Sequence, residues 1–133
     1  MSLPRIILAD DHPAFLDKVR LLLSGEFDIV AAVDNGEAAV EAVTHLQPDV
    51  AILDISMPRL SGLEALARLH AAGDRTPIVI LTMHEGPEFQ SAARTAGATG
   101  YVIKRQVGTH LLRAIQAVIE GRAITADAPS DGR

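Results

Sequence analysis

Three aspartates stand directly after short apolar runs and have the chemistry of a metal site. Asp10 and Asp11 follow the run that ends at Ala9, and Asp54 follows the run that ends at Leu53. Two carboxylates about 4 Å apart repel each other by roughly 4 kcal/mol at an effective dielectric of 20, so their approach requires a cation. Oxygen ligands without histidine or cysteine are typical of Mg²⁺, and the aspartates therefore predict a magnesium site.

A hydroxyl and an ammonium group follow two further apolar runs. These groups belong to Thr82 and Lys104. Together with Mg²⁺, they are the groups that hold a transferring phosphoryl group. A carboxylate can be the nucleophile that accepts it. Asp54 is the expected acceptor because its run lies at the centre of the predicted sheet, which leaves Asp10 and Asp11 to hold the metal.

These side chains meet only if the runs before them are neighbouring parallel strands. The runs are continuous rather than alternating, which is typical of strands buried on both faces. They are Ile6–Ala9, Val50–Leu53, Ile78–Leu81 and Tyr101–Ile103. Phe27–Val33 is a fifth candidate, placed at an edge because Asp28 interrupts it. In such sheets, sites form beyond the carboxyl ends of the strands, where the polar residues stand.

Helical patterns separate the runs. The first helix begins at Pro13, the second covers Ala38–Leu46, the third follows Gly62, the fourth covers Pro87–Ala96, and the last ends before Gly121. The alternation predicts an α/β fold with helices on both faces of a parallel sheet. We expect the flavodoxin-like (βα)5 arrangement, with five strands in the order 2-1-3-4-5.

Composition narrows the possible functions. The 133 residues fit a single domain, and 48% of them are apolar. The absence of cysteine excludes disulfides, thiolate zinc sites and cysteine nucleophiles. The net charge of −5, without a basic cluster, argues against a free-standing nucleic-acid binder. No apolar run approaches the length of a membrane span, so we expect a cytoplasmic protein. The histidines show no metal-ligand spacing and are interpreted as surface or cap residues: His12, His45, His70, His84 and His110.

Several short segments, in this order and spacing, resemble the response-regulator receiver family of two-component signalling. They are Asp10-Asp11-His12-Pro13, Asp54-Ile55-Ser56-Met57-Pro58 with Gly62, Leu81-Thr82, and Gly97-Ala98-Thr99-Gly100-Tyr101-Val102-Ile103-Lys104. The resemblance covers about residues 5 to 121. The first and last segments are most similar to the branch that precedes LuxR-type helix-turn-helix domains. Arg105 departs from the pattern, because many receivers have proline there.

The resemblance implies a phosphoryl-accepting site. Asp54 would take the group from the phosphohistidine of a sensor histidine kinase. Mg²⁺ would be held by Asp11, Asp54 and the backbone carbonyl of Ser56, with Asp10 binding directly or through water.

It also implies a switch. Thr82 and Lys104 would bind phosphoryl oxygens, and Tyr101 would be the aromatic residue that turns inward when Thr82 moves. Ser56 and His84 occupy positions that often set the phosphoryl lifetime in the family.

The helix predicted over Pro87–Ala96 is the expected moving part. Its inward face offers Phe89 and then mostly Ala92, Ala93 and Ala96, so little apolar area anchors it. The output surface would consist of this helix, the following strand and the last helix. A homodimer would form through that surface or through the first and last helices.

The domain prediction places a receiver in residues 1–124 and a tail or truncated linker in residues 125–133. The segment Gly121-Arg122-Ala123-Ile124-Thr125 resembles the junction that leads to a DNA-binding domain. We therefore expect a chain cut from a longer transcriptional regulator, with DNA contacts only through a missing C-terminal domain.

Two alternative functions, a phosphatase and an electron carrier, lack a required feature in this sequence. A third alternative remains open. Phosphatases of the haloacid dehalogenase type carry a second aspartate two residues after the nucleophile, and that position is Ser56 here. A flavodoxin-like electron carrier requires a loop that binds the flavin phosphate, which Asp10 and Asp11 would repel. The chain is therefore predicted not to be an enzyme beyond its own phosphoryl transfer and hydrolysis. An interaction module that no longer uses phosphate is the open alternative.

Overall fold

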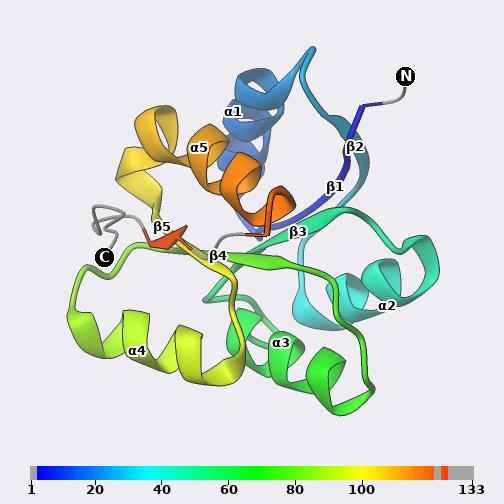
Figure 1. The fold of residues 1–133 in the computed structure, drawn as a ribbon, viewed down its shortest axis with the longest axis vertical. Coiled ribbons are helices and arrows are strands. Elements are labelled where there is room, and N and C mark those ends of the chain that lie inside the picture. Colours follow the sequence, from blue (N-terminus) through cyan, green and yellow to red (C-terminus); the bar gives the residue numbers. More distant parts are fainter. Residues whose placement is uncertain (1–2, 122–123, 126–133) are drawn as a thin grey trace.

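The computed structural model describes residues 3–121 and 124–125, in which strands and helices alternate (Figure 1). The strands are β1 (Arg5–Ala9), β2 (Asp28–Val33), β3 (Val50–Asp54), β4 (Ile78–Thr82), β5 (Gly100–Ile103) and β6 (Ile124–Thr125). The helices are α1 (Pro13–Leu23), α2 (Gly36–Leu46), α3 (Gly62–Ala71), α4 (Pro87–Ala96) and α5 (Val107–Ile119). A short 3-10 turn, Lys104–Gln106, joins β5 to α5.

The strands form one parallel sheet in the order β2-β1-β3-β4-β5-β6. The predicted order of the first five strands is confirmed, with β2 at an edge. The strand β6 was not predicted: Ile124 pairs with Gly100, and Thr125 pairs with Tyr101. Of the predicted tail 125–133, all but Thr125 lies outside the described residues.

Two apolar layers enclose the sheet. In Figure 1, α1 and α5 lie on one side of the sheet, and α2, α3 and α4 lie on the other. Successive strand residues enter opposite layers: Ile6 and Leu8 of β1 pack on the first side, and Ile7 and Ala9 on the second. The continuous apolar runs therefore have the expected cause, because both faces of each central strand are buried.

Local chemistry sets the helix boundaries. Pro13 and Pro87 begin α1 and α4, as proline does at a first helical position. The helix α2 begins at Gly36, two residues before the predicted start, because the Asn35 side chain accepts the N–H of Ala38 and caps it. Sequence periodicity did not reveal this polar cap.

The helix α4 is weakly anchored, as predicted, but its inward face differs. Ala93 is the buried residue of this helix, with Phe89 and Ala96 half-buried. Ala92 is exposed, so its predicted inward position is wrong. Phe89, Ala93 and Ala96 form the inward stripe of the helix, and Ala92 lies at the edge of this stripe, about 100° around the axis from the buried Ala93. Among the described residues, no helix is both long enough and apolar enough to span a bilayer.

Candidate functional site

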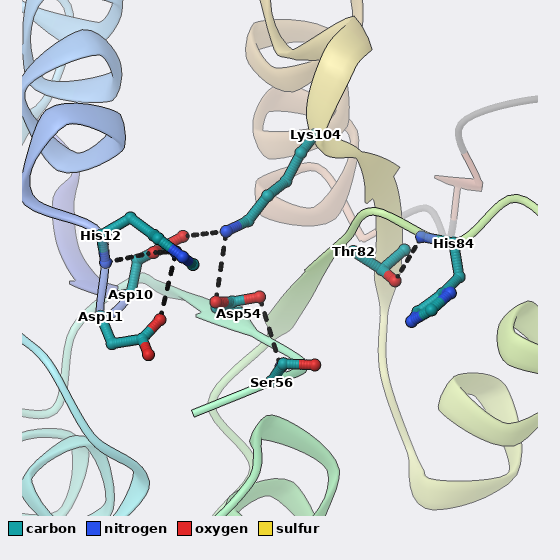
Figure 2. A network of polar contacts seen from close by, with 8 residues as sticks. All are labelled: Asp10, Asp11, His12, Asp54, Ser56, Thr82, His84 and Lys104. Atoms are coloured by element: carbon teal, nitrogen blue, oxygen red, sulfur yellow. Dashed lines mark hydrogen bonds and ion pairs between the residues drawn. The ribbon is translucent and has the colours of Figure 1, made fainter. Parts of the chain in front are cut away.

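The carboxyl ends of four neighbouring strands bring the predicted polar residues together (Figure 2). Asp10 follows β1, Asp54 ends β3, Thr82 ends β4 and Lys104 follows β5. Their exposed fractions are 1%, 2%, 0% and 9%. Buried polar groups of this kind require partners, so their convergence defines the candidate site.

The Lys104 ammonium lies between two carboxylates. Its Nζ is 2.7 Å from Asp10 Oδ2 and 3.2 Å from Asp54 Oδ2. The same nitrogen lies 4.6 Å from the centre of the Phe15 ring, within the range of a cation–π contact. Phe15, on α1, thus holds the lysine over the carboxylates, a role that the sequence analysis missed.

Three buried carboxylate oxygens are left without a well-aligned hydrogen bond from the described residues: Asp10 Oδ2, Asp11 Oδ1 and Asp54 Oδ2. Lys104 and His12 approach them as ion-pair partners, the histidine only when it is protonated. One ligand atom from each of Asp10, Asp11, His12 and Asp54 lies within 4.8 Å of all the others. Carboxylate oxygens at this spacing fit a divalent cation.

Burial and crowding disfavour the ionised form of Asp54. Desolvation by burial is the largest influence, and the neighbouring charge of Asp10 acts in the same direction. The charge of Lys104 and the backbone N–H of Ser56, 3.3 Å from Asp54 Oδ1, act in the opposite direction. The net result is a pKa for Asp54 above its ordinary value of 3.8.

The start of α3 packs directly on the backbone of Asp54. Gly62 donates its N–H to the carbonyl of Ile55 at 3.0 Å, and a Cβ at this position would overlap the Asp54 carbonyl. Ser61 and Glu64 form a capping box that fixes the beginning of the helix. Glycine at position 62 is therefore required by close approach, which explains its place in the predicted motif.

The loop between β4 and α4 is tied to Thr82 and Tyr101. The hydroxyl of Thr82 accepts the backbone N–H of His84 at 3.0 Å (Figure 2), and the Tyr101 hydroxyl donates to the carbonyl of His84 at 3.2 Å. The His84 ring stacks on Phe89 with 4.2 Å between centroids. Tyr101 is 4% exposed, so the proposed switch residue is already inward in this structure.

His12 is exposed and occupies the N-cap position of α1, as predicted, but it also lies in the acidic cluster. Its side chain is exposed, but Nδ1 lies 3.1 Å from Asp10 Oδ1 and 3.2 Å from Asp11 Oδ1 (Figure 2). The available signal was its position in the sequence, directly after the two aspartates. The Nδ1 atom of His12 is therefore close to the carboxylates that are predicted to hold the metal.

A groove of about 480 Å³ opens beside the site. Its lining residues come from α1 and its N-cap, from the end of β5 and from the loops after β4 and β5: His12, Phe15, Lys18, Met83, Ile103, Lys104 and Arg105. Arg105, the departure from the family pattern, forms a two-pronged ion pair with Glu85, at 2.6 Å for both contacts. Both side chains are exposed, so the pair joins the two loops with little effect on stability.

Comparisons with known proteins agree with this geometry. Residues 6–116 match the family model of the response regulator receiver domain. The chain is 33% identical to the transcriptional regulatory protein DegU of Brevibacillus brevis over 121 residues, which are 90% of this chain and 51% of DegU. It spans little more than half the length of the curated relatives that it matches.

Solved structures give the same result. A LuxR-family two-component response regulator from Aurantimonas sp. SI85-9A1 superposes with a TM-score of 0.89 at 32% identity, covering 95% of this chain and 91% of that one. The isolated receiver domain of RcsB from Salmonella enterica, solved with the phosphomimetic BeF₃⁻, gives a TM-score of 0.84 at 27% identity, covering 95% of each chain.

Proposed function

Because the chain belongs to the response regulator receiver family of two-component transcriptional regulators, we propose that Asp54 accepts a phosphoryl group from a sensor histidine kinase. The observation that carries this proposal is the convergence of the buried side chains of Asp10, Asp54 and Lys104 at the carboxyl edge of the sheet. A cytoplasmic location for this chain is part of the proposal.

The reaction uses the crowded carboxylate of Asp54. One of its oxygens attacks phosphorus as the P–N bond to the kinase imidazole breaks, and the departing nitrogen takes a proton from solvent. Asp54 is buried among carboxylates, so its negative charge is poorly solvated and available for attack. No general acid or base follows two residues later, since that residue is Ser56, and rapid hydrolysis lacks its catalyst.

A divalent cation would complete the site. Asp10, Asp11 and Asp54, with the carbonyl of Ser56, would hold Mg²⁺, which neutralises charge on the transferring group. Lys104 then turns from its carboxylate partners to the phosphoryl oxygens, and Thr82 donates its hydroxyl to them. Both side chains already stand at the ends of the strands beside Asp54.

The conformational change would pass from the site to the output surface through the loop after β4. When Thr82 is drawn to the phosphoryl group, its bond to the N–H of His84 is lost, and the contacts of His84 with Tyr101 and Phe89 must rearrange. The surface formed by α4, β5 and α5 would then change its affinity for a second copy or for an output domain. The α1–α5 face is the other candidate dimer contact, and DNA binding would belong to a C-terminal domain.

A phosphorylation assay tests the central claim. The chain is incubated with Mg²⁺ and acetyl phosphate, and Asp54 is examined by mass spectrometry for one added phosphoryl group. The matched control is Asp49→Asn, which removes a carboxylate at the opposite end of the sheet and should leave phosphorylation unchanged. If the wild-type chain gains no phosphoryl group, the open alternative of a phosphate-independent interaction module takes its place.

Amide hydrogen exchange tests the switch. Phosphorylation should alter exchange within residues 83–106, which include the loop after β4, the helix α4 and the strand β5. Identical exchange in this segment with and without the phosphoryl group would reject the proposed output surface.

A further inference from the structure

His12 occupies the N-cap position of α1 without capping the helix. Its side chain makes no cap hydrogen bond, and imidazole is not among the side chains preferred at this position. Instead, Nδ1 turns toward Asp10 and Asp11, at 3.1 and 3.2 Å from one oxygen of each (Figure 2). Helix capping therefore does not account for the orientation of this side chain.

The separations of these atoms fit a shared metal ion. When bonds to nitrogen and oxygen are about 2.1 Å long, neighbouring ligand atoms stand roughly 3.0–3.4 Å apart. The cluster of Asp10, Asp11, His12 and Asp54 fits within 4.8 Å, close to the diameter of one coordination shell. The side chains of Asp10 and Asp54 are 2% and 3% exposed, and the Lys104 ammonium contacts one oxygen of each, so these buried carboxylates already face a positive charge in the site.

We propose that His12 is a metal ligand that sets the ion selectivity of this site. Mg²⁺ prefers oxygen atoms and retains water, so it gains little from an imidazole. Borderline ions such as Co²⁺ and Zn²⁺ bind imidazole well, and they gain a nitrogen donor from His12 beside the carboxylates. The inference rests on the proposed function only in placing a divalent cation among Asp10, Asp11 and Asp54.

The competing explanation is that His12 merely positions the two carboxylates through an N–H donated from Nδ1. Asparagine separates the two roles, because its side-chain nitrogen stands at a similar distance from the backbone and can donate the same hydrogen bond. It is a poor ligand for Co²⁺ or Zn²⁺. His12→Asn therefore retains a positioning role and removes a coordinating one.

Isothermal titration of the metal-free chain with Mg²⁺, Co²⁺ and Zn²⁺ provides the test. In His12→Asn we expect affinity for Co²⁺ and Zn²⁺ to fall by about tenfold or more, and affinity for Mg²⁺ to change by less than about twofold. The control is His45→Asn on α2, which removes an exposed imidazole whose Nδ1 lies 2.9 Å from the Glu41 carbonyl. This control should bind all three ions as the wild type does.

The absorption spectrum of bound Co²⁺ gives a second readout, because loss of a nitrogen ligand shifts its visible bands. The same shift of Kd for all three ions, or no shift in any of them, overturns the proposal. Failure of the wild-type chain to bind Co²⁺ or Zn²⁺ also overturns it. Phosphorylation of Asp54 is scored separately with Mg²⁺. If a chain does not accept phosphoryl but still binds Co²⁺ and Zn²⁺ through His12, the proposed function fails and this inference stands.

Discussion

The two ends of the parallel sheet place aspartates in different electrostatic surroundings. At the amino end, Asp49 accepts the N–H of Arg5 at 2.7 Å, and Asp74 accepts the N–H of Thr76 at 2.9 Å and the Gln47 amide at 3.1 Å. At the carboxyl end, Asp10 and Asp54 each accept one backbone N–H, from His12 at 2.8 Å and from Ser56 at 3.3 Å, and their other oxygens share the Lys104 ammonium. The aspartates at the amino end contact hydrogen-bond donors, whereas at the carboxyl end Asp10 also lies close enough for its charge to disfavour ionisation of Asp54.

The pKa shifts follow this division. Burial raises the pKa of Asp74, but hydrogen bonds from Thr76 and Gln47 and the charge of His70 outweigh it, so the pKa is lowered. Burial also raises the pKa of Asp54, and the charge of Asp10 adds to the effect rather than opposing it. The folded state therefore stabilises the ionised form of Asp74 and destabilises the ionised form of Asp54. Groups that are destabilised in the folded state are common at functional sites.

The largest expected effect comes from Asp54→Asn. This substitution should abolish phosphoryl incorporation, and it should also raise the free energy of unfolding at neutral pH by about 1–2 kcal/mol, because a poorly solvated charge is lost. Mass spectrometry and urea denaturation measure the two effects. The same change at Asp49 should produce neither of them, and a stability loss in Asp54→Asn would contradict the comparison.

Loss of the Lys104 ammonium at the carboxyl end of the sheet should have the second-largest effect, a decrease in stability. In Lys104→Met, without metal, the free energy of unfolding should fall by about 3 kcal/mol, since two buried carboxylates lose their shared partner. Addition of Asp54→Asn to this variant should recover much of the loss, as measured by urea denaturation of the double variant. Additive effects of the two substitutions would show that the side chains are not coupled.

A divalent cation should stabilise the folded protein by binding at the carboxyl end of the sheet and not at the amino end. At about 100 times its dissociation constant, Mg²⁺ should add roughly 2.7 kcal/mol to the free energy of unfolding, and a chelator should reverse the gain. The gain should vanish in Asp11→Asn and persist in Asp74→Asn. Thermal denaturation with and without Mg²⁺ checks this, and equal stabilisation of both variants would place the ion elsewhere.

At the amino end, Asp74→Ala should destabilise the fold by about 1 kcal/mol at neutral pH, because the Thr76 and Gln47 donors lose their acceptor. Phosphorylation of Asp54 should continue at the wild-type rate. Urea denaturation and the phosphorylation assay test the two halves of this prediction. A slowed reaction would mean that the two ends are not independent.

The smallest expected effects lie in the pH profile of the metal-free chain. The lowered pKa of Asp74 contributes stability above its ordinary value of 3.8, and this is lost as the pH falls through its folded pKa. The raised pKa of Asp54 has the opposite sign: its favourable contribution is complete below 3.8 and is lost as the pH rises through its folded pKa. The advantage of Asp54→Asn should therefore grow as the pH rises above 3.8, whereas the deficit of Asp74→Asn should shrink as the pH falls below 3.8. Denaturation series across this range measure both differences.

Sequence predicted the sheet and the site because both follow from one rule. Continuous apolar runs predict strands buried on both faces, and the carboxyl ends of neighbouring parallel strands meet at one edge. The meeting of Asp10, Asp54 and Lys104 follows from this rule, whereas the order of β1 to β5 came from the flavodoxin-like arrangement, and the structure contains both. Their exact contacts were not needed for the prediction.

The missed features depend on side-chain direction, which no periodicity encodes. Phe15 reads as an ordinary core residue, yet its ring lies under the Lys104 ammonium. His12 is a surface residue, as predicted, but the contacts of its Nδ1 with Asp10 and Asp11 were not predicted. The Arg105–Glu85 pair joins two loops that are distant in sequence. The contacts of Phe15 and Arg105 arise only after the fold has brought distant parts of the chain together, whereas His12 is a sequence neighbour of both its partners.

The two-residue strand β6 makes the two edges of the sheet different. On one side, β5 already has a neighbour along Gly100 and Tyr101, so its main-chain groups there are not free to recruit an extended segment from another molecule. On the other side, β2 is the outer strand of the described sheet. Edge-to-edge pairing with another molecule would thus begin at β2. It would begin at β5 only after β6 had separated from that strand.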